Sequence, residues 1–137
     1  MIFHHHDLQI ELDDSWWAEA GMSGFVPKAP TYRVKPDAYG RTIFQLPIKE
    51  IGPIRRNPGV GIFNSNESKT ARQRVLCILS GFRKDAPMPP VEVVDVPAGG
   101  LFRYKLINGT HRLYCSLAVG FSHVPAVEGF DITRLDY

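Results

Sequence analysis

The stretch from residue 102 to 125, FRYKLINGTHRLYCSLAVGFSHVP, constrains the fold more than any other part of the chain. A strand-like run leads through a glycine turn into an apolar pattern of helical period, which predicts strand, turn and helix in direct succession. The predicted helix opens with His111 and Arg112 instead of acidic residues. Because a helix start carries about half a positive charge, each cation there costs roughly 0.3–1 kcal/mol unless an anion answers it. The residues therefore predict a phosphate-binding turn.

Composition limits the class of protein. With 137 residues, 44% of them hydrophobic, the chain is long enough for one compact core. A balance of 16 basic and 14 acidic residues excludes a grip on nucleic acid by bulk charge alone. Two cysteines are too few for a disulfide framework, and the chain contains no basic leader and no 18-residue apolar run. We expect a soluble, cytoplasmic protein without a membrane partner.

Periodicity and turn residues predict the remaining elements. Asp13 and Asp14 precede a short helix that ends at Gly21, and Ile48 to Ile54 continues as extended chain. The Pro36–Gly40 turn predicts a hairpin. The two strands of this hairpin are predicted at residues 31–34 and 41–48. The other predicted elements are a helix at 67–82, a strand at 91–96 paired with one at 102–107, a helix from 110 to 119 and a closing strand at 123–127.

Histidines and cysteines receive structural interpretations. His4, His5 and His6 are adjacent, and side chains that alternate along a strand cannot all face one ion. We therefore interpret them as exposed residues or part of a purification tag, and predict no metal site. Cys77 is predicted to pack as a small hydrophobic residue.

A basic loop forms the next candidate site. Arg55 and Arg56 precede an Asn-Pro-Gly step in a long loop. Their guanidinium groups suit bidentate hydrogen bonds to phosphate, but a solvated loop has the same composition, so both interpretations stay open.

From residue 72 to 127 the chain resembles the ParB/sulfiredoxin superfamily. It is most similar to sulfiredoxin in PPVEV (residues 89–93), in the turn Gly99-Gly100 and in GTHRLY (residues 109–114). The resemblance implies an α+β single domain at 46–137, a mixed sheet with two main helices. We expect residues 1–45 to form an N-terminal extension with a short helix and a β-hairpin.

The same resemblance implies that residues 108–112 cradle nucleotide phosphates. Asn108 and Gly109 form the turn, and Thr110, His111 and Arg112 face the ligand; ATP or CTP with Mg is the implied cofactor. Thr110 stands where sulfiredoxin has its cysteine nucleophile. A threonine hydroxyl is a far poorer nucleophile than a thiolate at neutral pH, which excludes sulfinic acid reduction.

Catalysis is a separate expectation. Glu92 resembles the acidic residue near the sulfiredoxin nucleotide site, and we expect it to act as base or metal ligand, with His111 as a second catalytic candidate. The reaction would be phosphotransfer or nucleotide hydrolysis.

Two alternatives remain. A DNA-binding accessory module or ParB-like nuclease of plasmid or phage origin would use Arg55, Arg56, Arg103 and Lys105 on backbone phosphates. In a closed scaffold without ligand, Glu128 or Asp131 would neutralise the basic turn from inside.

Overall fold

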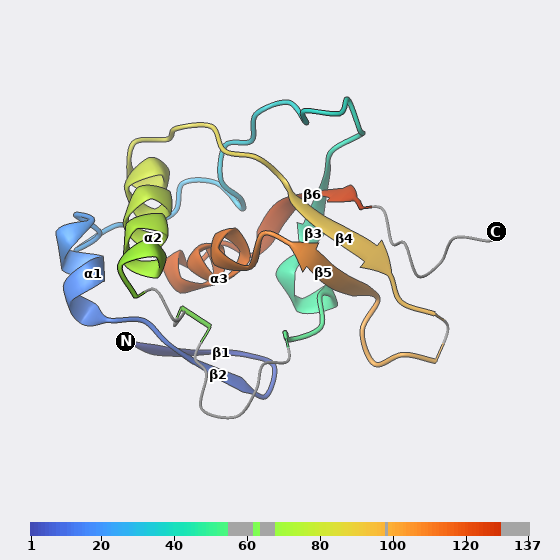
Figure 1. The fold of residues 1–137 in the computed structure, drawn as a ribbon, viewed down its shortest axis with the longest axis horizontal. Helices are drawn as coiled ribbons and strands as arrows, with labels where there is room; N and C mark the ends of the chain where they lie inside the picture. The colour runs from blue at the N-terminus through green and yellow to red at the C-terminus, as the bar shows by residue number, and fades with distance from the viewer. Residues whose placement is uncertain (55–61, 64–67, 98, 130–137) are drawn as a thin grey trace.

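The computed structural model describes residues 1–54, 62–63, 68–97 and 99–129. Its centre is a four-stranded mixed sheet in the order β3-β6-β4-β5 (Figure 1). β6 runs antiparallel to β3 and parallel to β4, and β4 runs antiparallel to β5. The strands are β3 (Phe44–Pro47), β4 (Val91–Asp95), β5 (Tyr104–Asn108) and β6 (His123–Glu128). The predicted α+β class with a mixed sheet is confirmed.

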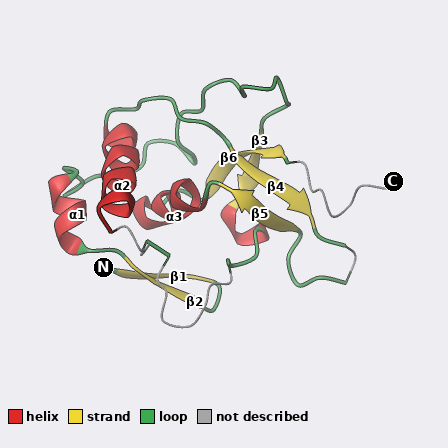
Figure 2. Ribbon diagram, viewed as in Figure 1, coloured by secondary structure: helices red, strands yellow, loops and turns green. Residues whose placement is uncertain are grey.

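The helices gather beside this sheet, with α1 next to α2 and α2 next to α3 (Figure 2). Arg72 on α2 forms an ion pair with Glu19 on α1. The helices are α1 (Asp14–Glu19), α2 (Ser68–Arg83) and α3 (Thr110–Val119). All three agree closely with the sequence prediction, and Asp13 caps α1 by accepting the Ser15 N–H at 2.8 Å. Within the described residues, no helix combines the length and apolarity needed to cross a membrane.

The hairpin predicted between residues 31–34 and 41–48 is wrong. β3 pairs with β6, whereas Val34 forms a parallel bridge with Met88. The predicted turn itself exists, because the Gly40 N–H donates to the Asp37 carbonyl at 3.1 Å. Local residues therefore specify the bend, but the strands on either side find partners far away in the chain.

A different hairpin occupies the N-terminal region. β1 (Ile2–His5) pairs antiparallel with β2 (Leu8–Glu11) as a separate two-stranded sheet, visible in Figure 1 below the helices. The expected extended run from residue 48 is also interrupted, because Ile48–Glu50 forms the 3-10 helix η1. Core residues come from both sides of residue 45, and those from the first part are Ile10, Leu12, Ala20, Met22 and Tyr32.

His5 is part of this core, so the interpretation as an exposed residue or tag is wrong for it. Its side chain is 3% exposed, with Nδ1 2.9 Å from the Tyr114 hydroxyl and Nε2 3.2 Å from the Ile48 carbonyl. Because a carbonyl only accepts, Nε2 carries the proton and Nδ1 accepts from Tyr114. The neutral imidazole thus joins β1, η1 and α3.

His5 predicts a loss of stability in acid. Burial lowers the pKa of His5 from its ordinary value of 6.5, and the charge of His6 contributes to the lowering. Below pH 6.5 the unfolded chain therefore binds this proton more strongly than the folded protein. The free energy of unfolding consequently decreases as the pH is lowered. Chemical unfolding between pH 7.5 and 5 measures the slope. We expect His5→Gln to remove this pH dependence of the free energy of unfolding. His4→Gln, at an exposed position, should leave the pH dependence unchanged.

The two thiols lie in different environments. Cys115 is fully buried in α3, and burial raises its thiol pKa. Cys77 is exposed, so the prediction that it packs in the core is wrong. Val75 and Leu79 are the buried residues near it on α2, and Cys77 lies between them on the solvent-exposed side of the helix.

Candidate functional site

The start of α3 is built by a chain reversal at Gly109. Its φ of 103° lies in the left-handed region, and a Cβ there would lie 2.7 Å from Cγ1 of Val91. Glycine therefore lets β5 turn directly into α3 while the turn packs on β4. The first intrahelical bond runs from the Leu113 N–H to the Gly109 carbonyl at 2.9 Å. The amides ahead of Leu113 consequently precede the helical hydrogen-bond ladder, as an anion site requires.

The first turn of α3 itself supplies no negative side chain. Gly109 is the N-cap, so no side chain caps the helix, and its first turn has no acidic residue. Thr110 is half-buried and opens the helix, and Asn108 is exposed at the end of β5. The half-buried His111 has its ring 5.9 Å from that of Phe63.

Arg112 turns back toward the segment ahead of β4. Its Nη2 donates to the Pro90 carbonyl at 3.2 Å, and the Tyr32 hydroxyl donates to the Pro89 carbonyl at 2.5 Å. The two side chains thus fasten consecutive carbonyls of the Pro-Pro step. Burial raises the pKa of Tyr32, and the positive charge of Arg112 opposes that rise.

The charge of Arg112 is not neutralised by any described carboxylate. Each ion pair among the described residues involves other groups. Arg112 Nε is buried and has no hydrogen-bond partner in the described part of the chain. Leaving a buried charged donor unmatched costs more than about 1–3 kcal/mol. Of the two internal acids considered, Glu128 forms no described ion pair with Arg112, and Asp131 lies outside the described residues.

Glu92 lies on the other face of the sheet. Val91 faces Gly109, and side chains alternate along a strand, so Glu92 points away from the start of α3. Its Oε1 accepts from Nη2 of Arg41 at 3.3 Å. The structure therefore does not bring Glu92 together with His111.

Arg41 pairs with both Asp37 and Glu92, and neither Arg41 nor Asp37 was predicted from the sequence as a site residue. Asp37 binds the Arg41 guanidinium through two contacts, Oδ2 to Nε at 2.9 Å and Oδ1 to Nη2 at 3.0 Å, and Oδ2 also accepts from the Arg41 backbone N–H at 2.9 Å. These hydrogen bonds lower the pKa of Asp37 to about 2. The available signal was an acid and a base four residues apart around Gly40, but it does not reveal the contact with Glu92.

Of the four basic residues predicted to contact DNA phosphates, the structure describes two. Arg55 and Arg56 lie outside the described residues. Arg103 and Lys105 are exposed, and the Arg103 guanidinium lies 5.2 Å from the centre of the Tyr104 ring. In the described ranges, no group of three or more histidine, cysteine, aspartate or glutamate residues is arranged to hold a metal ion.

Comparison with known proteins gives no match. No protein-family model matches the chain, and neither a curated protein nor a solved structure is similar to it. The resemblance to the ParB/sulfiredoxin superfamily therefore depends on the sequence motifs alone, and the function must be argued from the site.

Proposed function

We propose that the start of α3 binds the phosphate group of a nucleotide or of another phosphorylated small molecule. The amides ahead of Leu113 and the Arg112 guanidinium are the donors, and Thr110 adds a hydroxyl. ATP and CTP are the nucleotides that the sequence resemblance implies. Phosphate suits this site because its charge complements both the helix dipole and the guanidinium.

The buried Nε of Arg112 is the observation that carries this proposal. Nη2 already has the Pro90 carbonyl, whereas Nε has no acceptor among the described residues. An anion supplies both the missing acceptor and the missing negative charge. A neutral partner would supply only the acceptor, so a charged ligand fits better.

Glu92 has no catalytic role in the proposed site. A metal-assisted reaction needs a carboxylate or base at the transferred group. Glu92 is on the opposite face and paired with Arg41, and the described first turn of α3 has no acidic residue. The proposal is therefore phosphate binding, without an assigned Mg ligand.

Thermal unfolding with ATP, CTP and pyrophosphate, each with and without Mg, tests the proposal. A ligand that binds only the folded state at 100 times its Kd adds about 2.7 kcal/mol to the free energy of unfolding. Thr110→Glu places a carboxylate in the first turn, where it should stabilise the free protein by roughly 0.3–1 kcal/mol and repel phosphate. We expect this variant to unfold at a higher temperature and to lose the ligand-induced shift.

Two arginine variants complete the experiment. Arg112→Gln removes the guanidinium at the site and should abolish the ligand-induced shift. Arg103→Gln removes an exposed guanidinium just before β5 and should leave the shift unchanged. Because Arg112 also holds Pro90, the ligand-induced shift is compared, not the unfolding temperature itself. A shift that persists in Thr110→Glu, or the absence of a shift with all three ligands in the unmodified protein, would contradict the proposal.

DNA binding is the second candidate, favoured by the exposure of Arg103 and Lys105 on and beside the edge strand β5. Contacts to backbone phosphates make retention of duplex DNA fall steeply with salt. We expect such retention to survive Arg112→Ala and to be lost when Arg103 and Lys105 are both replaced by glutamine. Equal retention by that double variant would count against the DNA-binding role of these two residues.

A further inference from the structure

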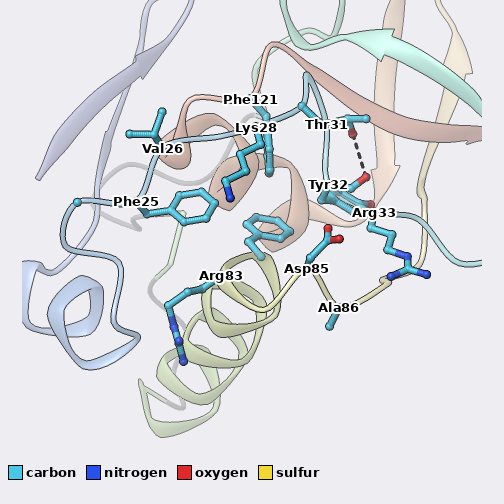
Figure 3. A pocket seen from close by; sticks show the side chains of 13 residues that line it. Phe25, Val26, Lys28, Thr31, Tyr32, Arg33, Arg83, Asp85, Ala86 and Phe121 are labelled. Atoms are coloured by element: carbon cyan, nitrogen blue, oxygen red, sulfur yellow. Dashed lines mark hydrogen bonds between the residues drawn. The ribbon is translucent and has the colours of Figure 1, made fainter.

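A cavity of about 620 Å³ lies between the loop at residues 24–33 and the C-terminal end of α2 (Figure 3). Its floor is aromatic, because Tyr32, Phe82 and Phe121 are buried there. Tyr32 stacks on Phe82 with ring centres 5.3 Å apart, and Phe121 meets Phe82 edge-on at the same distance. The half-buried Phe25 adds a wall. A cavity of this size with an aromatic floor suits one small ligand with a planar ring.

The loop that walls the cavity is fixed by backbone hydrogen bonds. Near one end, the Phe25 N–H donates to the Met22 carbonyl at 2.9 Å. Near the other, the Pro30 carbonyl accepts from the N–H groups of Ser122 and His123 at 3.1 and 3.0 Å. A ligand therefore does not have to order this wall, which lowers the entropy cost of binding.

Two exposed residues of opposite charge line the cavity without pairing with each other. Figure 3 shows the Lys28 ammonium and the Asp85 carboxylate directed into the same space. Among the described residues, neither side chain has an ion-pair partner, and they do not pair with each other. Arg33 and Arg83 also line the cavity, but their guanidinium groups turn away from that space (Figure 3). The inward-facing charges are thus one cation and one anion.

Asp85 lies in the left-handed region just beyond the C-terminal end of α2. Its φ is 56°, and α2 ends at Arg83, one residue before Lys84; the next N–H, that of Ala86, donates to the Gly81 carbonyl at 2.9 Å. Glycine is usual at this left-handed position, and a carboxylate there also meets the negative end of the helix dipole. A ligand cation at Asp85 would offset the unfavourable charge.

We propose that this cavity binds a free aromatic α-amino acid. The ring lies on the aromatic floor, the ligand carboxylate meets Lys28, and the ligand ammonium meets Asp85. An aromatic acid or an aromatic amine would contact only one of the two protein charges. This proposal is separate from phosphate binding, because the start of α3 does not line the cavity.

The test titrates the full chain with four probes, followed by calorimetry and by amide NMR shifts of residues lining the cavity. The probes are L-phenylalanine, 3-phenylpropanoate, phenethylamine and L-alanine. We expect L-phenylalanine to bind about ten-fold more tightly than either analogue with a single charge, since each lost contact is a hydrogen bond to a charged group. L-alanine, without a ring, should not bind in the same concentration range.

Two variants assign each charge. In Lys28→Gln, the affinity for L-phenylalanine should fall about ten-fold while that for phenethylamine is unchanged. In Asp85→Asn, L-phenylalanine should weaken and 3-phenylpropanoate should not; asparagine tolerates the left-handed backbone, so the fold is kept.

Lys84→Gln is the matched control, because Lys84 is the exposed neighbour of Asp85 and does not line the cavity. It should leave all affinities unchanged. The proposal is overturned if no probe gives saturable binding, if L-phenylalanine binds no more tightly than the two analogues, or if the control weakens binding as much as Lys28→Gln.

Discussion

Replacing Gly109 by alanine is expected to lower the free energy of unfolding by about 2–4 kcal/mol, the sum of a backbone and a packing cost. The φ of 103° disfavours any residue with a Cβ, and the added methyl would lie 2.7 Å from Cγ1 and 3.0 Å from Cβ of Val91. Val91 is fully buried in β4 and cannot give way without disturbing the sheet. Chemical denaturation measures the change.

Gly99→Ala separates the two costs. Gly99 has a nearly equal φ of 96°, but no atom lies within 4 Å of the position of an added Cβ. We expect it to cost only about 1 kcal/mol, from the backbone conformation alone. Equal losses in the two variants would mean that contact with Val91 contributes nothing, and that the turn is not held against β4 as described.

Tyr114→Phe is expected to cost about 1–3 kcal/mol although it removes a single oxygen atom, because it leaves the buried Nδ1 of His5 and the half-buried Ile54 N–H unmatched. The hydroxyl accepts from the Ile54 N–H at 3.1 Å and donates to Nδ1 of His5 at 2.9 Å. The Tyr114 ring is fully buried and would stay in place, so packing is preserved. The loss reports the hydrogen bonds and is read from urea denaturation at pH 7.5, where His5 is neutral in both states.

Tyr39→Phe is the matched control. Tyr39 is 83% exposed and its ring packs against the Arg41 guanidinium, 5.2 Å away, a contact that does not need the hydroxyl. We expect a change within about 0.5 kcal/mol. A Tyr114→Phe variant as stable as this control would show that the bonds linking β1, residue 54 and α3 do not contribute to stability.

The proposed phosphate site was partly predictable. The absence of an acid and the presence of His111 and Arg112 at a helix start are visible in the sequence, and the structure has α3 beginning at Thr110 with no side-chain cap. The direction of Arg112 was not predictable, because it depends on Pro90, which lies 22 residues earlier in the chain. The side of the sheet on which Glu92 lies was also not predictable, because it depends on how β4 packs between its neighbouring strands and against the start of α3.

The sequence by itself determined the elements whose signals are local: α2, α3, the β4–β5 hairpin, the start of α1 near Asp13, and the turn at Gly109. Side-chain period and turn residues act over a few positions, so these elements form wherever they finally pack. Only the tertiary structure decided that β3 joins β6 and that His5 is buried against Tyr114, 109 residues away. Strand partners and buried polar pairs depend on which distant surfaces meet, and no local pattern encodes that choice.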